Sequence, residues 1–194
     1  MNIFGTPIQT SFVIQDDLDR ALESSGMLSL LEENKVWNCS VETSYFSENH
    51  KEALAKLNDA LDNCVMPFAV NYVKPYIVGG PSEVLFDHIW VNRYEGKSHQ
   101  ERHSHPGSEV SFVYMYKTTE RHSRLRFHNT NEAHIYDIKD RTGVLFSELE
   151  VDVFLQPREV IFFPSYLQHC VSPCEANGER ITLSGNITVR PVEN

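Results

Sequence analysis

The sequence contains no run of about 18 consecutive apolar residues, which is the length that a helix needs to cross a bilayer. Its first residues, Met1–Gly5, have neither the basic region nor the apolar region of a secretory signal. We therefore expect no association with a membrane and a cytoplasmic location.

Positive charge is also scarce. The 194 residues include 17 Lys and Arg against 27 Asp and Glu, which gives a formal net charge of −10. Binding to nucleic-acid phosphates requires clustered Lys and Arg, and no basic stripe is visible, so we expect no nucleic-acid partner. The hydrophobic content of 41% and the charged content of 23% are typical of a globular protein. The length fits one domain with a substantial core.

Cysteines are few, at positions 39, 64, 170 and 174. Their spacing matches no zinc-ribbon pair, and a cytosolic chain with a full core does not need disulfides. His169 with Cys170 and Cys174 suggests a metal cluster, but a fourth soft ligand at sensible spacing is missing. We favour free thiols.

The front third of the chain has a helical pattern. A first helical segment begins at Asp16, and Gly26 favours its division into two short helices. Its apolar face consists of Leu18, Ala21, Leu22, Leu28 and Leu31. In the second segment Asn49 and Glu52 form a capping-box pattern, and Pro67 ends the helix. Leu54, Leu57 and Leu61 recur on one face of this segment. Both segments are predicted to be packing layers without chemistry.

From about residue 84 the pattern becomes that of short strands separated by turns. The β-rich runs are 84–86, 89–91, 110–116, 125–127, 151–155, 160–163 and 181–189. Short strands with little helix between them indicate an antiparallel barrel or jelly roll. We expect a single domain, mainly β, with residues 1–80 as a mainly helical support layer and residues 81–194 as the barrel. The polar segment 128–150 is predicted to be an irregular loop that serves as a lid or specificity element.

Two of the nine histidines stand in the motif QERHSHPG, residues 100–107. His103 and His105 are two residues apart, so on an extended chain their side chains point to the same side, which suits joint metal binding. A third histidine, His169, follows 64 residues after His105 and ends the motif FFPSYLQH. Arg180 then begins an apolar strand. An arginine that enters a barrel core is costly unless it meets an anion, and a ligand carboxylate is a suitable partner.

Together these motifs resemble a known family. The residues that carry the resemblance are Trp37-Asn38-Cys39 with Thr43-Ser44, Trp90-Val91-Asn92-Arg93-Tyr94, His103-Ser104-His105-Pro106, Ser111-Phe112-Val113-Tyr114, Phe163-Pro164-Ser165 and His169 to Arg180. The chain is similar over nearly its whole length to Fe(II)/2-oxoglutarate-dependent oxygenases of bacteria and phages, which are related to prolyl hydroxylases. The resemblance implies a double-stranded β-helix, a cupin-like jelly-roll barrel, that holds one iron at its mouth.

The resemblance also implies the metal ligands. His103 matches the first ligand of the superfamily pattern and His169 the distal one. His105 stands where that pattern has a carboxylate, which leaves the site one unit more positive. Imidazole suits iron, so metal binding is expected even with this departure.

The same resemblance implies a site for the cosubstrate. Arg180 and Thr182 would hold the distal carboxylate of 2-oxoglutarate, and Tyr94 lies where related prolyl hydroxylases contact the cosubstrate. Asn92 and Tyr114 are weaker candidates for the pocket wall, whereas Trp90, Phe162 and Phe163 are predicted to be core. The remaining histidines match no position of the motif: His50, His88, His99, His122, His128 and His134.

The activity implied is that of a dioxygenase. It would hydroxylate a small molecule or peptide with dioxygen while converting 2-oxoglutarate to succinate and CO2, and no catalytic residue is expected beyond the metal centre. One alternative is a cupin-type dioxygenase that uses no 2-oxoglutarate, with Glu109 as a fourth ligand. Another is a non-catalytic β-barrel binding module. Such barrels often pair through exposed strands or helices, so the sequence leaves a homodimer open.

Overall fold

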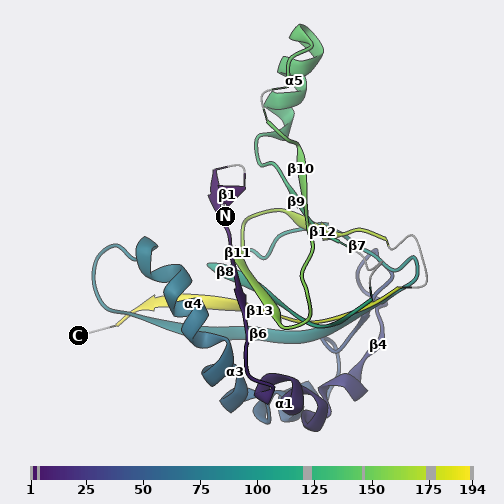
Figure 1. The fold of residues 1–194 in the computed structure, drawn as a ribbon, viewed down its shortest axis with the longest axis vertical. Coiled ribbons are helices and arrows are strands. Elements are labelled where there is room, and N and C mark those ends of the chain that lie inside the picture. Colours follow the sequence, from purple (N-terminus) through teal and green to yellow (C-terminus); the bar gives the residue numbers. More distant parts are fainter. Residues whose placement is uncertain (1, 4, 120–123, 146, 174–177, 193–194) are drawn as a thin grey trace.

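The computed structural model describes residues 2–3, 5–119, 124–145, 147–173 and 178–192. Two antiparallel sheets face each other, and helices cover one of them (Figure 1). The helices are α1 (Asp17–Ser25), the 3₁₀ helix η1 (Met27–Leu30), α2 (His50–Ala55), α3 (Asn58–Cys64), α4 (Met66–Val73), the 3₁₀ helix η2 (Lys74–Tyr76) and α5 (Glu132–Thr142). The strands are β1 (Asn2–Ile3), β2 (Thr6–Pro7), β3 (Gln9–Phe12), β4 (Glu32–Glu33), β5 (Glu42–Thr43), β6 (Ser82–Glu95), β7 (Gln100–His103), β8 (Val110–Thr118), β9 (Leu125–His128), β10 (Glu150–Val153), β11 (Glu159–Pro164), β12 (His169–Val171) and β13 (Glu179–Pro191).

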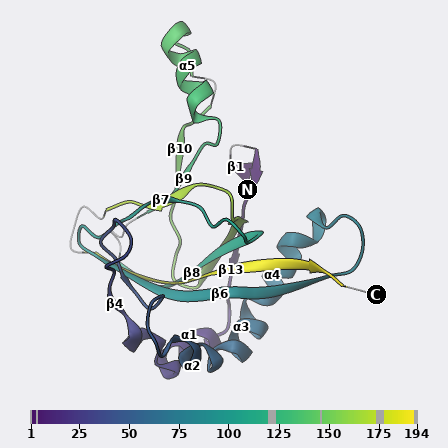
Figure 2. The same cartoon turned by 180° about the vertical axis from the view of Figure 1, so that it is seen from behind.

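The larger sheet has seven strands in the order β3-β11-β8-β13-β6-β5-β4, and the smaller has four in the order β10-β9-β12-β7. The long strands β6 and β13 run side by side through the larger sheet (Figure 2). Strands β3, β4 and β5 come from the first 80 residues, which therefore supply part of the larger sheet as well as its helical cover. The predicted mainly β, antiparallel architecture with N-terminal helices is confirmed.

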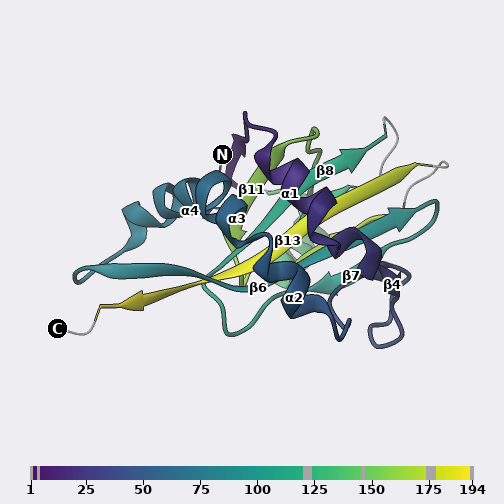
Figure 3. The ribbon, with the colours of Figure 1, turned by 90° about the horizontal axis from the view of Figure 1, so that it is seen from below.

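Each face of the larger sheet packs against its own apolar core. Side chains alternate along β8, as the pleat of a strand requires. Phe112 and Tyr114 pack against the helices, whereas Val113 and Met115 point between the two sheets. Helices α1, α3 and α4 lie across the outer face (Figure 3). The inner face is thereby left to form the barrel interior.

The first helical segment is divided as predicted. Gly26 has φ 86°, a left-handed conformation that ends α1 and leads into η1. Asp19 on α1 fixes the helix to the barrel, because it accepts hydrogen bonds from the Tyr114 hydroxyl at 2.6 Å and from Arg158 Nε at 3.0 Å.

The prediction of one continuous second helix that begins near Asn49 and ends at Pro67 is wrong. The segment forms three short helices, α2, α3 and α4, and Pro67 lies in the first turn of α4 instead of ending a helix. Proline is tolerated there because the first turn of a helix has no partner for the missing N–H. The Asn49 side chain makes no capping hydrogen bond, so the capping box does not form.

The prediction of an irregular segment over residues 128–150 is also wrong. It contains α5, which ends at Gly143 with φ 72° and stands away from the barrel in both views (Figures 1 and 2). None of the helix residues is buried.

Cys39, Cys64 and Cys170 are free thiols, as predicted, and Cys174 lies outside the described residues. Among the helices of the described residues, none is long and apolar enough to span a bilayer.

Candidate metal centre and cosubstrate pocket

Three histidines meet inside the barrel. One ligand nitrogen from each of His103, His105 and His169 lies within 4.8 Å of the other two. The ring centroids are 4.3 Å apart for His103 and His169, 5.0 Å for His103 and His105, and 5.2 Å for His105 and His169. Among the described residues, no other group of three or more His, Cys, Asp or Glu side chains is arranged so that it could hold a metal ion. The sequence predicted the same three residues.

Strand pairing places two of these ligands. In the antiparallel pairing of β12 with β7, His169 is the partner of His103, so both side chains leave the sheet on the same face. His105 follows two residues after His103, just beyond the end of β7. Its backbone N–H donates to the Ser165 carbonyl at 2.9 Å, which fixes the loop that carries the third imidazole.

Backbone carbonyls orient two of the rings. Nδ1 of His103 lies 2.7 Å from the Glu101 carbonyl oxygen, and Nδ1 of His169 lies 2.9 Å from that of Leu167. A carbonyl oxygen only accepts, so in both rings Nδ1 carries the proton and the lone pair is on Nε2. Orientation of a metal-binding imidazole by a hydrogen bond from its other nitrogen is typical of metal sites.

All three imidazoles are held in their neutral form. Burial lowers the pKa of His103. Burial, together with the repulsion that would arise if His103 and His105 were both protonated, lowers the pKa of His105 to about 4. The pKa of His169, which is fully buried, is lowered well below its ordinary value for the same reason. Neutral imidazole is the form that binds metal, so the nitrogens are available at neutral pH.

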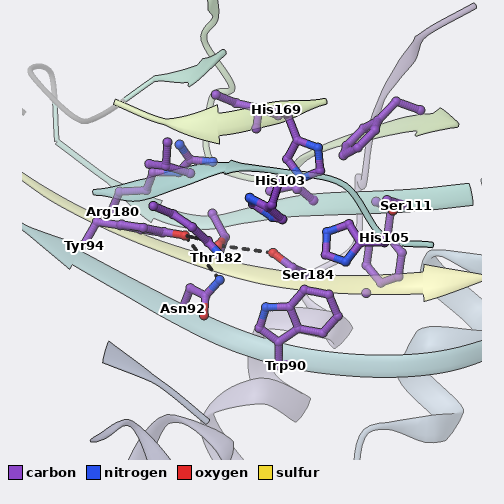
Figure 4. A pocket seen from close by; sticks show the side chains of 17 residues that line it. Trp90, Asn92, Tyr94, His103, His105, Ser111, His169, Arg180, Thr182 and Ser184 are labelled. Atoms are coloured by element: carbon purple, nitrogen blue, oxygen red, sulfur yellow. Dashed lines mark hydrogen bonds between the residues drawn. The ribbon is translucent and has the colours of Figure 1, made fainter. Parts of the chain in front are cut away.

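Arg180 lines the same pocket from strand β13. Its side chain is 2% exposed, and its guanidinium carbon lies 5.6 Å from the centroid of the Tyr94 ring. Burial lowers its pKa to about 10, which still leaves the group charged at neutral pH. Thr182 and Ser184 follow on the same face of β13, with their hydroxyl oxygens 3.4 Å apart. In Figure 4, Arg180 lies at one end of the pocket and His105 at the other.

Tyr94 also lies in this pocket. It is 3% exposed, and its hydroxyl donates to Gln100 Oε1 at 2.7 Å and shares a 3.3 Å hydrogen bond with the Asn92 amide (Figure 4). The structure therefore brings together all six residues that the sequence assigned to the metal and the cosubstrate.

The sequence matches the model of a protein family described as "Putative 2OG-Fe(II) oxygenase" over residues 88–186, where 2OG is 2-oxoglutarate. That range is about half of the chain and contains the three histidines, Arg180 and Thr182. The chain belongs to this 2OG-Fe(II) oxygenase family. It is thus an enzyme of the class that the sequence resemblance implied.

Solved structures with the same fold include other oxygenases of this class. An oxidoreductase of the 2OG-Fe(II) oxygenase family from Burkholderia pseudomallei has a TM-score of 0.64 at 17% identity, over 95% of this chain and 84% of that one. A prolyl-4-hydroxylase from Pseudomonas putida has a TM-score of 0.58 at 18% identity, over 96% and 94%. The 2OG complex of a collagen prolyl hydroxylase from Paramecium bursaria Chlorella virus-1 has a TM-score of 0.56 at 14% identity, over 97% and 98%. These likenesses confirm the predicted double-stranded β-helix. A search of curated proteins found no match.

The donor set fits the metal that gives the oxygenase family its name. Neutral imidazoles are suitable ligands for Fe(II), and His103, His105 and His169 would hold it with three donors. Glu109 is not a fourth ligand, because it lies outside the histidine group and its Oε2 accepts a hydrogen bond from the backbone of Val189 at 2.8 Å. The four-ligand cupin arrangement is therefore absent from the described part of this oxygenase.

Among the residues predicted around the oxygenase site, one was misassigned and the others are where the sequence placed them. Tyr114 does not line the pocket, because it faces the helices on the other side of β8. Asn92 does line it. Trp90 and Phe163 are buried, as predicted for core residues, and they also pack against His105 and His169, with ring centroids 5.6 Å and 4.8 Å apart respectively. Among the described residues, the histidines that match no position of the motif lie outside the metal group: His50, His88, His99, His128 and His134. His122 is not among the described residues.

Proposed function

We propose that this oxygenase is an Fe(II)- and 2-oxoglutarate-dependent dioxygenase that hydroxylates its substrate. One observation carries the proposal: the three histidines and the Arg180–Thr182 pair line a single pocket of the barrel interior. A metal and a dicarboxylic keto acid are the two ligands that these two groups of side chains would recognise.

His103, His105 and His169 would hold the iron. When bound, iron and 2-oxoglutarate together supply the oxidising power for C–H hydroxylation, with succinate and CO2 as the products of the keto acid. With three neutral imidazoles the protein adds no negative charge of its own to the metal. A doubly anionic cosubstrate is therefore favoured by the iron as well as by Arg180.

Arg180 would bind the far carboxylate of 2-oxoglutarate. Its planar guanidinium offers paired donors that match a carboxylate, and its burial keeps water from competing for them. The Thr182 hydroxyl, on the same face of β13, would donate to the same carboxylate. These two contacts set the register of the keto acid along the pocket, with its other end toward the histidines.

Tyr94 and Gln100 would form the wall beside the cosubstrate. The Tyr94 hydroxyl already donates to Gln100, so its ring is fixed by a hydrogen bond as well as by packing. Burial raises the pKa of this hydroxyl, which therefore stays protonated and acts as a hydrogen-bond donor. Apolar neighbours such as Phe163 and Leu125 keep the interior dry.

Succinate formation tests the proposal. Purified protein with Fe(II), ascorbate, 2-oxoglutarate and dioxygen is expected to form succinate slowly without a substrate, and the reaction should require all of the iron, 2-oxoglutarate and dioxygen. His103→Ala should abolish it, whereas His134→Ala, which removes an exposed imidazole from α5, should not. Well-folded, iron-loaded protein that forms no succinate would contradict the proposal.

A further inference from the structure

An open cleft adjoins the metal centre on the side away from Arg180. It has a volume of about 350 Å³ and is lined by Tyr45, Asp87, His88, residues 104–108 and Asn186. Of the three proposed ligands, His105 alone lines both this cleft and the interior pocket. A molecule in the cleft would therefore meet the metal centre from the end opposite the cosubstrate site.

Tyr45 and His88 line one wall of the cleft, and further aromatic side chains pack against Tyr45. Tyr45 is 39% exposed, stacks on His88 at a centroid distance of 6.2 Å and meets Trp90 edge-on at 5.5 Å. Trp90 in turn packs against His105. Behind Tyr45, Trp37 and Phe46 lie 5.4 Å and 5.0 Å from its ring. Aromatic contacts thus link the exposed Tyr45 through Trp90 to His105, a proposed iron ligand.

A carboxylate lies on the same surface. Asp87 has a side chain that is 33% exposed, and its Oδ2 lies 3.1 Å from Nδ1 of His88 and accepts a hydrogen bond from the Ser108 hydroxyl at 3.3 Å. His88 therefore links the carboxylate to the Tyr45 ring. No lysine or arginine is among the described residues that line the cleft. The full chain carries a net charge of −10, which raises the local concentration of cations.

A partly exposed aromatic ring beside a carboxylate can recognise a protonated nitrogen, since the ring attracts the cation and the carboxylate accepts its hydrogen bonds. We propose that this cleft is the substrate-docking site of the oxygenase and that it takes substrates carrying a protonated nitrogen, in a free amine or in a basic peptide side chain. The cation donates a hydrogen bond to the exposed part of the Asp87 carboxylate and lies near the exposed part of the Tyr45 ring, beside the His88 that links them, and the adjoining carbon chain extends toward His105. This inference rests on the proposed function.

Matched probes test it by ligand-observed NMR titration at low ionic strength. The cationic probes are 1,5-diaminopentane and acetyl-Gly-Lys-Gly-amide. Their neutral counterparts are 1,5-pentanediol and the same tripeptide with norleucine, and an acidic counterpart has glutamate. A cationic probe is expected to bind roughly tenfold more tightly than its neutral counterpart, as a charged hydrogen bond contributes that much. Tighter binding of 1,5-diaminopentane would identify a free amine as the ligand, and tighter binding of the lysine tripeptide would identify a basic peptide side chain.

Variants locate the site. Asp87→Asn should remove the preference for cations, and Tyr45→Leu, which keeps an apolar side chain, should weaken cation binding about two- to fivefold. Asp59→Asn removes the same charge from an exposed position on α3 and should leave the preference unchanged. The inference is overturned if no cationic probe binds, if the neutral or acidic probe binds as tightly, or if Asp59→Asn acts like Asp87→Asn. Succinate formation by the unaltered protein is measured separately, so that a failure of the proposed function is distinguished from a failure of the docking site.

Discussion

His169 lies directly opposite His103 in the pairing of β12 with β7, and their ring centroids are 4.3 Å apart. Both residues belong to strands, so the hydrogen-bonded sheet fixes their separation before any metal arrives. Both rings also donate Nδ1–H to a carbonyl two residues earlier in the chain. The backbone therefore preorganises the proposed ligand set, and folding supplies the free energy that its assembly requires.

The first prediction concerns the removal of His103 or His169, the two histidines that are paired across β7 and β12. His103→Ala or His169→Ala should weaken Fe(II) binding by roughly 100-fold or more, because one of three ligands is lost. Anaerobic equilibrium dialysis measures this affinity. His134→Ala is the matched control and should bind Fe(II) like the unaltered protein, since its imidazole is exposed on α5. Full affinity in His103→Ala would show that the metal is held elsewhere.

The second prediction concerns the Fe(II) affinity of the variant His105→Asp. A carboxylate oxygen is also a suitable ligand for Fe(II), and the change lowers the charge of the site by one unit. We expect this variant to bind Fe(II) within about tenfold of the unaltered protein, whereas His105→Leu should not. The same dialysis compares the two. Equal loss in both variants would mean that the site requires an imidazole at this position.

Arg180 carries the third prediction. Arg180→Lys keeps the charge but loses the paired donors, and Arg180→Ala loses both. The apparent KM for 2-oxoglutarate should rise by roughly 30-fold or more in Arg180→Ala and by less in Arg180→Lys, because truncating one partner of a buried charge pair costs about 2 to 5 kcal/mol. Fe(II) affinity should stay the same in both variants, as Arg180 lies at the far end of the pocket from His105. An unchanged KM would contradict its role.

Much of the site was predictable because its signals are local. Arg180 and Thr182 are two residues apart on one strand, so strand alternation alone puts them on one face. His103 and His105 have the same spacing, but His105 lies just beyond the end of β7 and is positioned by the loop that follows. The resemblance to a family linked these pairs with His169. The geometry that joins β7 to β12 depends on strand pairing across the chain, which no local pattern encodes.

The wrong predictions for Tyr114 and for helix α5 have different physical causes. Strand β8 is apolar on both faces, because one face packs on helices and the other fills the barrel. The sequence therefore gives no sign of which face Tyr114 takes. Helix α5 was missed for the opposite reason: it buries no residue, so it has no apolar stripe to mark it as a helix. The division of the chain at residue 80 stays a prediction.

Gly185 carries the fourth prediction. A Cβ at this position would overlap Ile89 Cδ1, and it would lie 2.6 Å from Phe112 Cε1 and 2.8 Å from the His88 carbonyl oxygen. Gly185→Ala should lower the free energy of unfolding by about 1 to 3 kcal/mol, as overpacking of a core does. Thermal unfolding measures the change. In an Ile89→Val background, which lacks the Cδ1 atom, the cost should be smaller, and an equal cost would contradict the steric explanation.

Asp152 carries the fifth prediction, which concerns acid stability. Arg126 donates to its two oxygens at 2.6 and 3.1 Å, and Arg124 donates at 3.1 Å, so hydrogen bonds from these groups lower the pKa of Asp152. A carboxyl whose pKa is lower in the folded state stabilises the fold above its ordinary pKa, and that contribution is lost as the pH falls through the lowered value. Asp152→Asn should be less stable than the unaltered protein by about 1 kcal/mol at pH 7.

Unfolding of both proteins by urea from pH 7 to pH 2.5 checks this dependence. The difference between them should shrink as the pH falls below 3.8, the ordinary pKa of the group. Asp137→Asn, which breaks an exposed pair with Arg141 on α5, is the matched control and should show little effect at any pH. A difference that stays constant with pH would contradict the assignment.

Anaerobic titration of the protein with Fe(II) and then 2-oxoglutarate tests the central claim most directly. A keto acid that binds to iron through its carboxylate and ketone oxygens gives a weak visible charge-transfer band. The account predicts that this band appears with the unaltered protein, saturates at one equivalent of iron, and requires His103 and His169. It also predicts that Arg180→Ala needs a much higher concentration of 2-oxoglutarate to reach the same band. Folded, iron-loaded protein that shows no band at saturating 2-oxoglutarate would contradict the account.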